Sequence, residues 1–219
     1  MGKIYAGVSD TAREVKKIYA GVNGVAKEIK KVYAGVNGVA KLIWQSDNLS
    51  KVYLFYHGDA CTDITGGWTK AFTFKTANGS NYTMTRLAVG PDALAGNRTS
   101  TGGTGEYCLY VRTVNSIDFT NYSKLCFLYE YKMPTFSSGT PQCRVGAFGS
   151  SYTDMRWSGY DSRFLAFEEI TNVKQSDYVS TTVEVDVSGV NESADVLFYC
   201  AFSNMKASYY VRFPEIWLE

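Results

Sequence analysis

The sequence predicts an all-β protein in two parts, a short module of β-hairpins followed by an antiparallel two-sheet sandwich. The first observation is a 14-residue repeat, which runs from Lys3 to Trp44 as KIYAGVSDTAREVK, KIYAGVNGVAKEIK and KVYAGVNGVAKLIW. The second is composition, because 17 Tyr and 20 Gly among many Thr, Ser and Val are typical of strands and turns. The third is a series of apolar runs after residue 50, regularly spaced and separated by Gly/Ser/Asn clusters.

Each repeat has the pattern of strand, turn and strand. In the second copy, Asn23-Gly24 is the turn signal, since both residues tolerate the positive φ of a type I′ turn. The register that follows from this turn opposes Val22 to Val25, Ile18 to Ile29, and Tyr19 to Glu28. A helix over AREVKKIYA or AKEIKKVYA is the competing interpretation, but the glycine of each YAG triplet and the Asn-Gly pairs interrupt it.

The Lys30-Lys31 bend between the second and third copies extends the same pattern. A turn there would pair Ile29 with Val32 and produce a meander of about six short strands. The apolar residues of such a sheet are small, and its edges are open to pairing. We therefore expect a partner to cover it, either the second domain, another chain or a larger assembly.

The KxYAGVNGVAKxIK units resemble N-terminal repeats on tail-associated proteins of phages and prophages from gut Firmicutes, where varied C-terminal domains follow them. The resemblance covers residues 3 to 44 and implies a virion tail or baseplate tip as the setting, with synthesis in the host bacterial cytoplasm. Repeats of strand, turn and strand also build fibrous viral shafts in which three chains wind together. We expect self-association through the repeats, with a trimer as one form, or binding to other tail proteins.

Charge and hydropathy exclude several classes of partner. Residues 1–50 hold eight Lys and Arg against four Asp and Glu, which leaves the rest of the chain mildly acidic. An acidic main domain argues against nucleic acid as a ligand. The sequence shows no signal peptide and no apolar run long enough for membrane insertion.

The five cysteines are an odd number and contain no CxxC pair. Most of them lie in apolar strand-like runs such as YCLYV, LCFLY and FYCAF. We expect reduced, buried thiols rather than a disulfide framework. The cysteines are Cys61, Cys108, Cys126, Cys143 and Cys200.

The predicted domains are residues 1–44 for the hairpin repeats, 45–50 (QSDNLS) for a linker and 51–219 for the sandwich. The order of GDACTDITGGW, IDFTNYSKLCFLYEYK and a final strand VRFPEIWLE resembles the jelly-roll domains of carbohydrate-binding modules and galactose-binding-like domains. This resemblance is one of fold and strand rhythm, and it implies a jelly-roll-like sandwich without assigning binding residues.

Catalytic chemistry has little support in the sequence. His57 is the only histidine, so a histidine-based triad or a multi-histidine metal site has one available member. No spacing brings two carboxylates into the pairing that a glycosidase uses. We therefore expect a protein that is not an enzyme and has no cofactor.

One segment could hold a structural Ca²⁺ ion. In GDACTDITGGW, the side chains of Asp59, Asp63 and Thr65 offer the oxygen ligands that a hard cation prefers. The alternative interpretation is that Gly-Gly-Trp is a turn that directs Trp68 into the core.

The best candidate for ligand binding is the stretch GSSYTDMRWSGYDSRF. Sugar recognition uses an aromatic ring for the C–H face of a sugar and planar polar groups for its hydroxyls. The candidate residues are Tyr152, Asp154, Arg156, Trp157, Tyr160, Asp161 and Arg163. The alternative is that Trp157 packs inward and the charges form ion pairs.

Taken together, these features predict a non-enzymatic tail or baseplate-tip protein of a phage or prophage. Its sandwich is expected to bind a cell-surface glycan or another tail component. The alternatives are a carbohydrate-binding module of a bacterial surface protein and, third, a glycan hydrolase.

Overall fold

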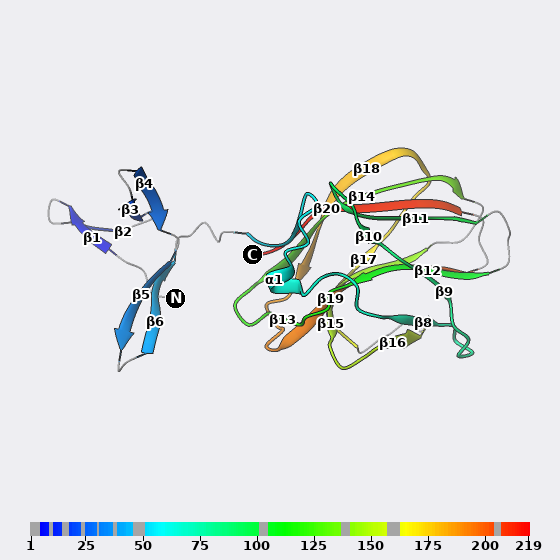
Figure 1. The fold of residues 1–219 in the computed structure, drawn as a ribbon, viewed down its shortest axis with the longest axis horizontal. Coiled ribbons are helices and arrows are strands. Elements are labelled where there is room, and N and C mark those ends of the chain that lie inside the picture. Colours follow the sequence, from blue (N-terminus) through cyan, green and yellow to red (C-terminus); the bar gives the residue numbers. More distant parts are fainter. Residues whose placement is uncertain are drawn as a thin grey trace. The chain divides into compact units, whose positions relative to one another are not determined.

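The computed structural model describes most of the 219-residue chain and divides it into two units, Met1–Lys51 and Val52–Glu219 (Figure 1). Each unit is considered separately below. The described residues are 5–8, 11–14, 18–22, 25–29, 31–36, 39–45, 51–100, 105–136, 141–156, 163–203 and 207–219.

The first unit consists of three antiparallel hairpins, one per repeat. The hairpin of the second repeat has the register expected from an Asn-Gly turn, with Ile18 opposite Ile29 and Val22 opposite Val25. The predicted strand pairing within each repeat is therefore confirmed. The strands are β1 (Tyr5–Val8) with β2 (Thr11–Glu14), β3 (Ile18–Val22) with β4 (Val25–Ile29), and β5 (Lys31–Val36) with β6 (Val39–Gln45).

The predicted continuous meander is wrong. Within the described part of this unit the strands form three separate two-stranded sheets, and Val32 pairs with Trp44 of its own hairpin instead of Ile29. A two-residue hairpin turn favours residues that tolerate positive φ, and Lys30-Lys31 has neither the Asn nor the Gly of the turn within the repeat.

The second unit contains one short helix and fourteen strands in the part of the chain that the structure describes. The elements are β7 (Val52–Tyr56), α1 (Thr62–Thr65), β8 (Thr73–Lys75), β9 (Thr83–Arg86), β10 (Ala88–Val89), β11 (Leu94–Ser100), β12 (Glu106–Arg112), β13 (Ile117–Asp118), β14 (Lys124–Phe136), β15 (Gln142–Gly149), β16 (Asp154–Arg156), β17 (Phe164–Ile170), β18 (Gln175–Asp186), β19 (Ser193–Ser203) and β20 (Ala207–Leu218). No helix among the described residues is long and apolar enough to cross a membrane.

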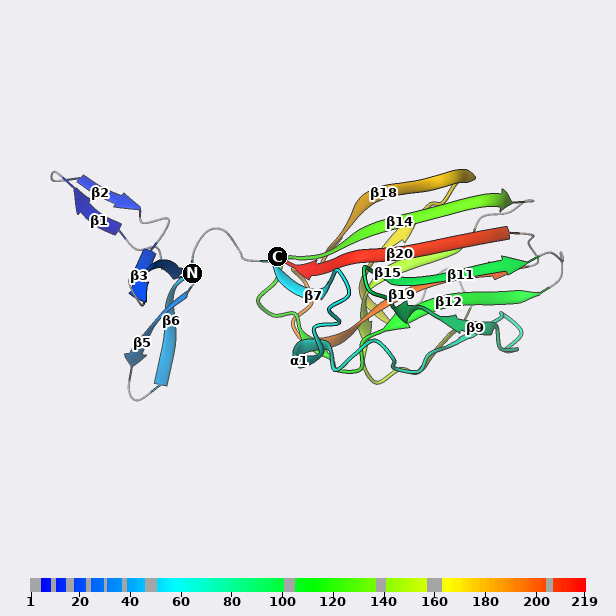
Figure 2. The same ribbon diagram turned by 45° about the horizontal axis from the view of Figure 1, so that its top comes forward.

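Two sheets pack face to face as a jelly-roll-like β-sandwich (Figure 2). The first sheet has the order β10-β11-β20-β14-β18, with β7 also paired to β20. The second sheet has the order β17-β15-β19-β12-β9, with β13 also paired to β19. The chain alternates between the sheets from β11 to β12, from β14 to β15 and from β18 through β19 to β20, as in jelly rolls. All pairings in these two sheets are antiparallel except β9 with β12.

The main core fills the space between the sheets. Strand β14 shows why the sequence folds this way, because Phe127, Tyr129 and Tyr131 point inward while Glu130 and Lys132 alternate with them on the other side. The phenylalanines of three strands meet in this core, where Phe213 lies edge-on to Phe127 and Phe198.

A second, smaller core covers the outer face of the second sheet. Here β8 and β16 form a parallel two-stranded pair, and their Phe74 and Met155 are buried with Leu197 and Tyr199 of β19. Strand β19 is consequently buried on both faces, which explains its unbroken apolar run in the sequence. The outer face of the first sheet is different, because none of the described strands or the helix of this unit covers it (Figures 1 and 2).

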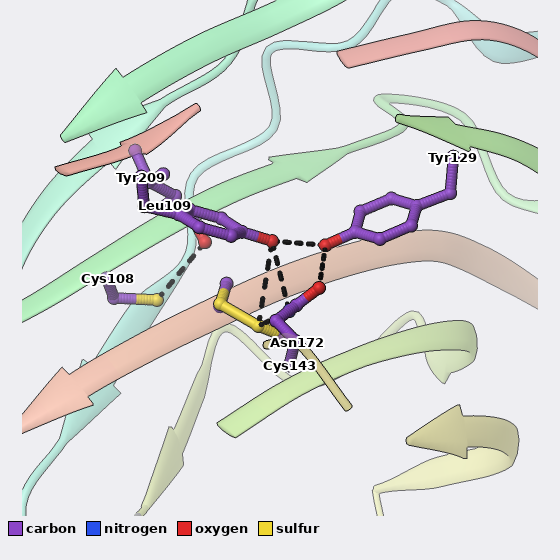
Figure 3. Close-up of a disulfide and its surroundings, with 7 residues drawn as sticks. Cys108, Leu109, Tyr129, Cys143, Asn172 and Tyr209 are labelled. Carbon is purple, nitrogen blue, oxygen red and sulfur yellow. Dashed lines mark hydrogen bonds between the residues drawn. A yellow bond between two sulfur atoms is a disulfide. The ribbon is translucent and has the colours of Figure 1, made fainter. Parts of the chain in front are cut away.

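A disulfide joins Cys143 of β15 to Cys200 of β19 (Figure 3). The two residues are directly opposed in the register of the neighbouring strands. The expectation of reduced cysteines throughout is therefore wrong for this pair, because only the strand pairing brings together residues that lie 57 positions apart. Beside the disulfide, the Asn172 side chain donates to Cys143 Sγ over 3.1 Å, and its oxygen accepts from the Tyr129 hydroxyl over 2.8 Å.

Candidate functional site

The structure brings together part of the ligand-binding cluster that the sequence predicts. Asp154 Oδ1 lies 2.9 Å from Arg163 Nη1, and Asp154 Oδ2 lies 2.9 Å from Lys75 Nζ. The guanidinium of Arg163 lies 5.4 Å from the centre of the Tyr152 ring. Arg156 is exposed at the end of β16. Three other members of the predicted cluster, Trp157, Tyr160 and Asp161, lie outside the described residues.

Asp154 is engaged by both Arg163 and Lys75. The hydrogen bond from Lys75 is the largest of several influences that lower the pKa of Asp154 below its usual range. Tyr152 is 44% exposed, and Arg163 approaches one of its ring faces. Among the described residues, the cluster therefore offers one exposed ring beside a set of satisfied ion pairs.

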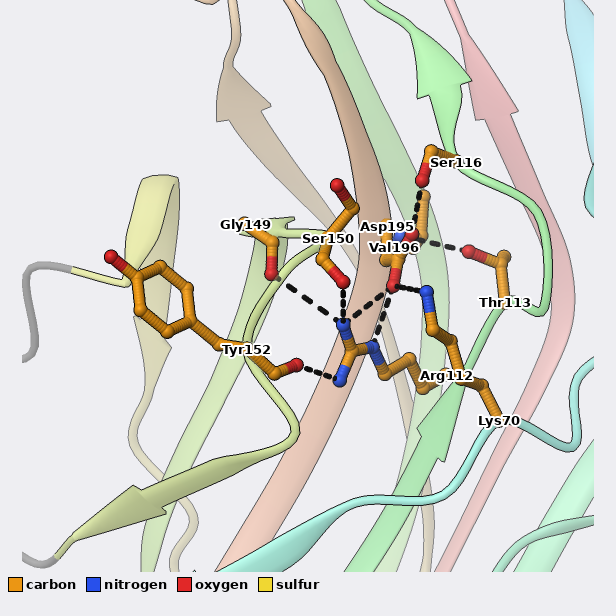
Figure 4. Close-up of polar contacts among 9 residues, drawn as sticks. All are labelled: Lys70, Arg112, Thr113, Ser116, Gly149, Ser150, Tyr152, Asp195 and Val196. Carbon is orange, nitrogen blue, oxygen red and sulfur yellow. Dashed lines mark hydrogen bonds and ion pairs between the residues drawn. The ribbon is translucent and has the colours of Figure 1, made fainter.

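A fully buried ion pair beneath this cluster was not anticipated from the sequence (Figure 4). Arg112 of β12 and Asp195 of β19 are both inaccessible to solvent, and Asp195 Oδ2 accepts from Arg112 Nε over 2.8 Å. Lys70 Nζ lies 2.5 Å from the same oxygen, and the Ser116 hydroxyl donates to Oδ1 over 2.7 Å. We call these four residues the buried clamp. The signal in the sequence was a charge inside each of two apolar runs, EYCLYVR and ADVLFYC.

The buried clamp also fixes the loop that carries Tyr152. Arg112 Nη1 donates to the Tyr152 carbonyl over 2.5 Å, and Nη2 donates to the Ser150 carbonyl over 3.3 Å. The guanidinium of Arg112 also lies 4.8 Å from the centre of the Phe148 ring. The clamp is therefore a structural element that ties the loop after β15 to the second sheet.

The oxygens proposed as Ca²⁺ ligands take part in local hydrogen bonds. Asp59 Oδ1 accepts from the Cys61 amide over 2.9 Å, and the buried Thr65 hydroxyl accepts from the Gly67 amide over 3.0 Å. Asp63 is exposed in the first turn of α1. Across the described ranges, no group of three His, Cys, Asp or Glu side chains is placed to hold a metal ion.

The alternative interpretation of this segment, a turn that buries Trp68, is the one that the structure has. Trp68 is 1% exposed, and its indole N–H donates to the Ala60 carbonyl over 3.2 Å. Gly66 and Gly67 both have positive φ, which accounts for the Gly-Gly pair before the tryptophan.

The uncovered outer face of the first sheet presents a different set of side chains. We call it the open face. The register of the strands aligns aromatic, charged and hydroxyl side chains in adjacent rows on the open face. The opposite side of the same sheet is apolar and faces the core. The residues of the open face are Tyr56, Leu128, Glu130, Lys132, Tyr178, Ser180, Thr182, Tyr210, Arg212 and Glu215.

Tyrosines and cations alternate across one end of the open face. Lys132 of β14 is opposite Tyr210 of β20, and its ammonium nitrogen lies 4.8 Å from the centre of that ring and 5.0 Å from the centre of the Tyr178 ring. The Arg212 guanidinium lies 4.2 Å from the centre of the Tyr178 ring and pairs with Glu130 of β14. These contacts hold the rings and cations in a fixed array on the sheet.

A hollow of about 300 Å³ lies beside this array. Its lining residues come from β14, β20, the end of β7 and the loop before β11, and they are His57, Asp92, Ala93, Leu128, Glu130, Arg212 and Pro214. His57 Nε2 lies 3.1 Å from Glu215 Oε1, and the His57 amide donates to the Pro214 carbonyl over 2.9 Å. The exposed Tyr56 ring lies edge-on to His57 at 4.7 Å, so a third tyrosine flanks the hollow.

No protein-family model matches the chain, and no curated protein sequence matches it. Among solved structures, the chain is similar to a carbohydrate-binding module described as specific for non-crystalline cellulose, CBM28. The likeness has a TM-score of 0.40 and 10% sequence identity, and it covers 70% of this chain and 80% of that one.

Proposed function

We propose that the Val52–Glu219 unit is a non-enzymatic domain that binds a cell-surface glycan on the open face. We further propose that the hairpin repeats attach it to a larger assembly, a phage or prophage tail. The observation that carries the binding proposal is the contrast between the two outer faces of the sandwich. One is sealed by a second apolar core, whereas the other carries exposed tyrosines, charged groups and a hollow.

The open face supplies the two kinds of contact that sugars need. Tyr178 and Tyr56 are 39% and 45% exposed, so their rings can pack against the C–H face of a pyranose. Arg212 and Glu130 line the hollow, where Arg212 can donate to sugar hydroxyls and Glu130 can accept from them. Both side chains are held by their mutual ion pair, which reduces the entropy lost when a ligand binds.

Binding without hydrolysis fits the carboxylates of this face. Glu130 pairs with Arg212, and Glu215 pairs with His57. A glycosidase uses a pair of carboxyl groups that are free to act on the scissile bond, whereas each of these two is engaged by a neighbouring side chain.

The test is a glycan array probed with the Val52–Glu219 fragment, which has its own core and clusters as a separate compact unit. We expect retention on at least one glycan class, and affinity reduced about tenfold, or about 1.4 kcal/mol, by Tyr178→Ala. Tyr152→Ala is the matched control, since it removes a comparably exposed tyrosine from the loop between β15 and β16, away from the open face. No retention on any glycan, or a larger loss in the control than in Tyr178→Ala, would contradict the proposal.

The role of the repeats rests on the marginal stability of two-stranded sheets. Each repeat forms an isolated hairpin, and an isolated hairpin in water needs further strands or a partner surface to be stable. Light scattering of the full chain and of the Val52–Glu219 fragment tests this. We expect an oligomer for the full chain and a monomer for the fragment, and a monomeric full chain at high concentration would exclude self-association.

A further inference from the structure

Lys132 occupies an unusual position on the open face. Its ammonium lies within 5.0 Å of the centres of two tyrosine rings, Tyr178 from β18 on one side and Tyr210 from β20 on the other. Both neighbouring strands therefore contribute a ring, and β14 supplies the cation between them. The two rings restrict the lysine to a small region without neutralising its charge.

Other cations of this face have carboxylate partners. Arg212 pairs with Glu130, and Lys124 pairs with Glu184 at 2.5 Å. Among the described residues, Lys132 has no carboxylate within ion-pair distance.

The nearest acids in the sequence do not compensate Lys132. Glu130 lies on the same side of β14 but is engaged by Arg212. Asp177 precedes Tyr178 on β18, where the register against β14 is irregular, and among the described residues it forms no ion pair with Lys132. The row continues with Asn97 of β11, an exposed residue opposite Tyr210 in the register and therefore on the far side of that ring from the lysine.

We propose that Lys132, between Tyr178 and Tyr210, binds an anionic group carried by the glycan, so that the ligand of the open face is an acidic saccharide. This inference rests on the proposed glycan-binding function and specifies the ligand class. The rings take the faces of the sugar, and the ammonium between them takes its anion by a charge-assisted hydrogen bond. A carboxylate of a uronic acid and a phosphate of a sugar-phosphate polymer share this chemistry.

Three probes distinguish these sources in calorimetric titrations of the Val52–Glu219 fragment. They are a polyuronate oligosaccharide, the same oligosaccharide after chemical reduction of its carboxyl groups to alcohols, and a sugar-phosphate oligomer. We expect at least one anionic probe to bind about tenfold more tightly than the reduced neutral one at low salt. The preferred anionic probe identifies the anion, and added salt should weaken its binding.

Variants assign this preference to Lys132. Lys132→Gln should weaken binding of the preferred anionic probe about tenfold, and Lys132→Arg should restore most of it, because the charge returns. Lys124→Gln is the matched control, a lysine on the same strand and face that already has a carboxylate partner. Thermal unfolding of each variant verifies that the fold is retained.

Two results would overturn the inference. One is equal affinity for the acidic probes and the neutral one, and the other is an effect of Lys124→Gln as large as that of Lys132→Gln. In either case, binding that is still lost in Tyr178→Ala leaves the proposed glycan-binding function intact. If none of the three probes binds, the acidic ligand is rejected, and the glycan array decides separately whether the broader function fails.

Discussion

Removing the charge of Asp195 tests how much the buried clamp contributes to the sandwich. Asp195 and Arg112 are both 0% exposed, and the carboxylate receives two guanidinium nitrogens at 2.8 and 2.6 Å. Asp195→Asn keeps the size of the side chain but leaves the Arg112 charge buried without its counter-ion. Loss of one partner of a buried pair costs about 3–5 kcal/mol. With a urea m-value of about 2 kcal/mol/M, the unfolding midpoint should fall by about 1.5–2.5 M.

The assay is urea unfolding of the Val52–Glu219 fragment followed by tryptophan fluorescence, since Trp68 is buried and reports on the fold. Lys70→Met is the control, because Lys70 is 27% exposed and its loss leaves Asp195 paired with Arg112, so about 1 kcal/mol is expected. Replacing both members of the pair, as Arg112→Met with Asp195→Leu, should destabilise less than Asp195→Asn alone. A loss below about 1 kcal/mol for Asp195→Asn would refute the reasoning.

Three further predictions concern the strands, the predicted cluster and the cysteines. Gly146→Ala should lower the free energy of unfolding by about 1–3 kcal/mol, because the added Cβ would meet the carbonyl of Ala166 on β17; an unchanged urea midpoint contradicts this. Lys75→Gln should raise the pKa of Asp154, measured by NMR titration, because the substitution removes the largest influence that lowers this pKa. An unchanged pKa would show that Arg163 alone sets the value. Thiol titration of the unfolded chain should detect three reactive cysteines before reduction and all five after it. Detection of five reactive cysteines before reduction would exclude the disulfide.

The sequence was sufficient where structure is set locally. The Asn-Gly dipeptide placed Val22 opposite Val25, and the register of the second repeat followed from that turn. The sequence failed at the Lys30-Lys31 bend, where the same alternation continues but the strands do not pair and the turn signal of Asn-Gly is missing. Alternation alone does not specify which neighbouring strands pair.

The double burial of β19 could not be derived from the sequence. Its apolar run predicts a buried strand, but the second core depends on the parallel pairing of β8 with β16, whose strands lie some eighty residues apart in the chain. The pairing of Cys143 with Cys200 was missed for a similar reason, since it depends on the neighbouring positions of β15 and β19.

The candidate site shows the same limit. The sequence favoured the segment from Tyr152 to Arg163 because suitable side chains are close together in the chain. On the open face, Lys132, Tyr178 and Tyr210 come from three strands that are adjacent only in the folded sheet. A usable signal was present in β14 and β20, where the polar alternation of YEYK and YYVR marks a side that does not face the core.

The central claim is that the open face, and not the segment around Tyr152, binds glycan. The most direct measurement is an NMR titration of the isotope-labelled Val52–Glu219 fragment with a saccharide that it retains on the array. The account predicts the largest amide shift changes in β14, β18 and β20, around Lys132, Tyr178 and Tyr210. Changes confined to the loop and strand from Tyr152 to Arg156, with these three strands unaffected, would contradict it.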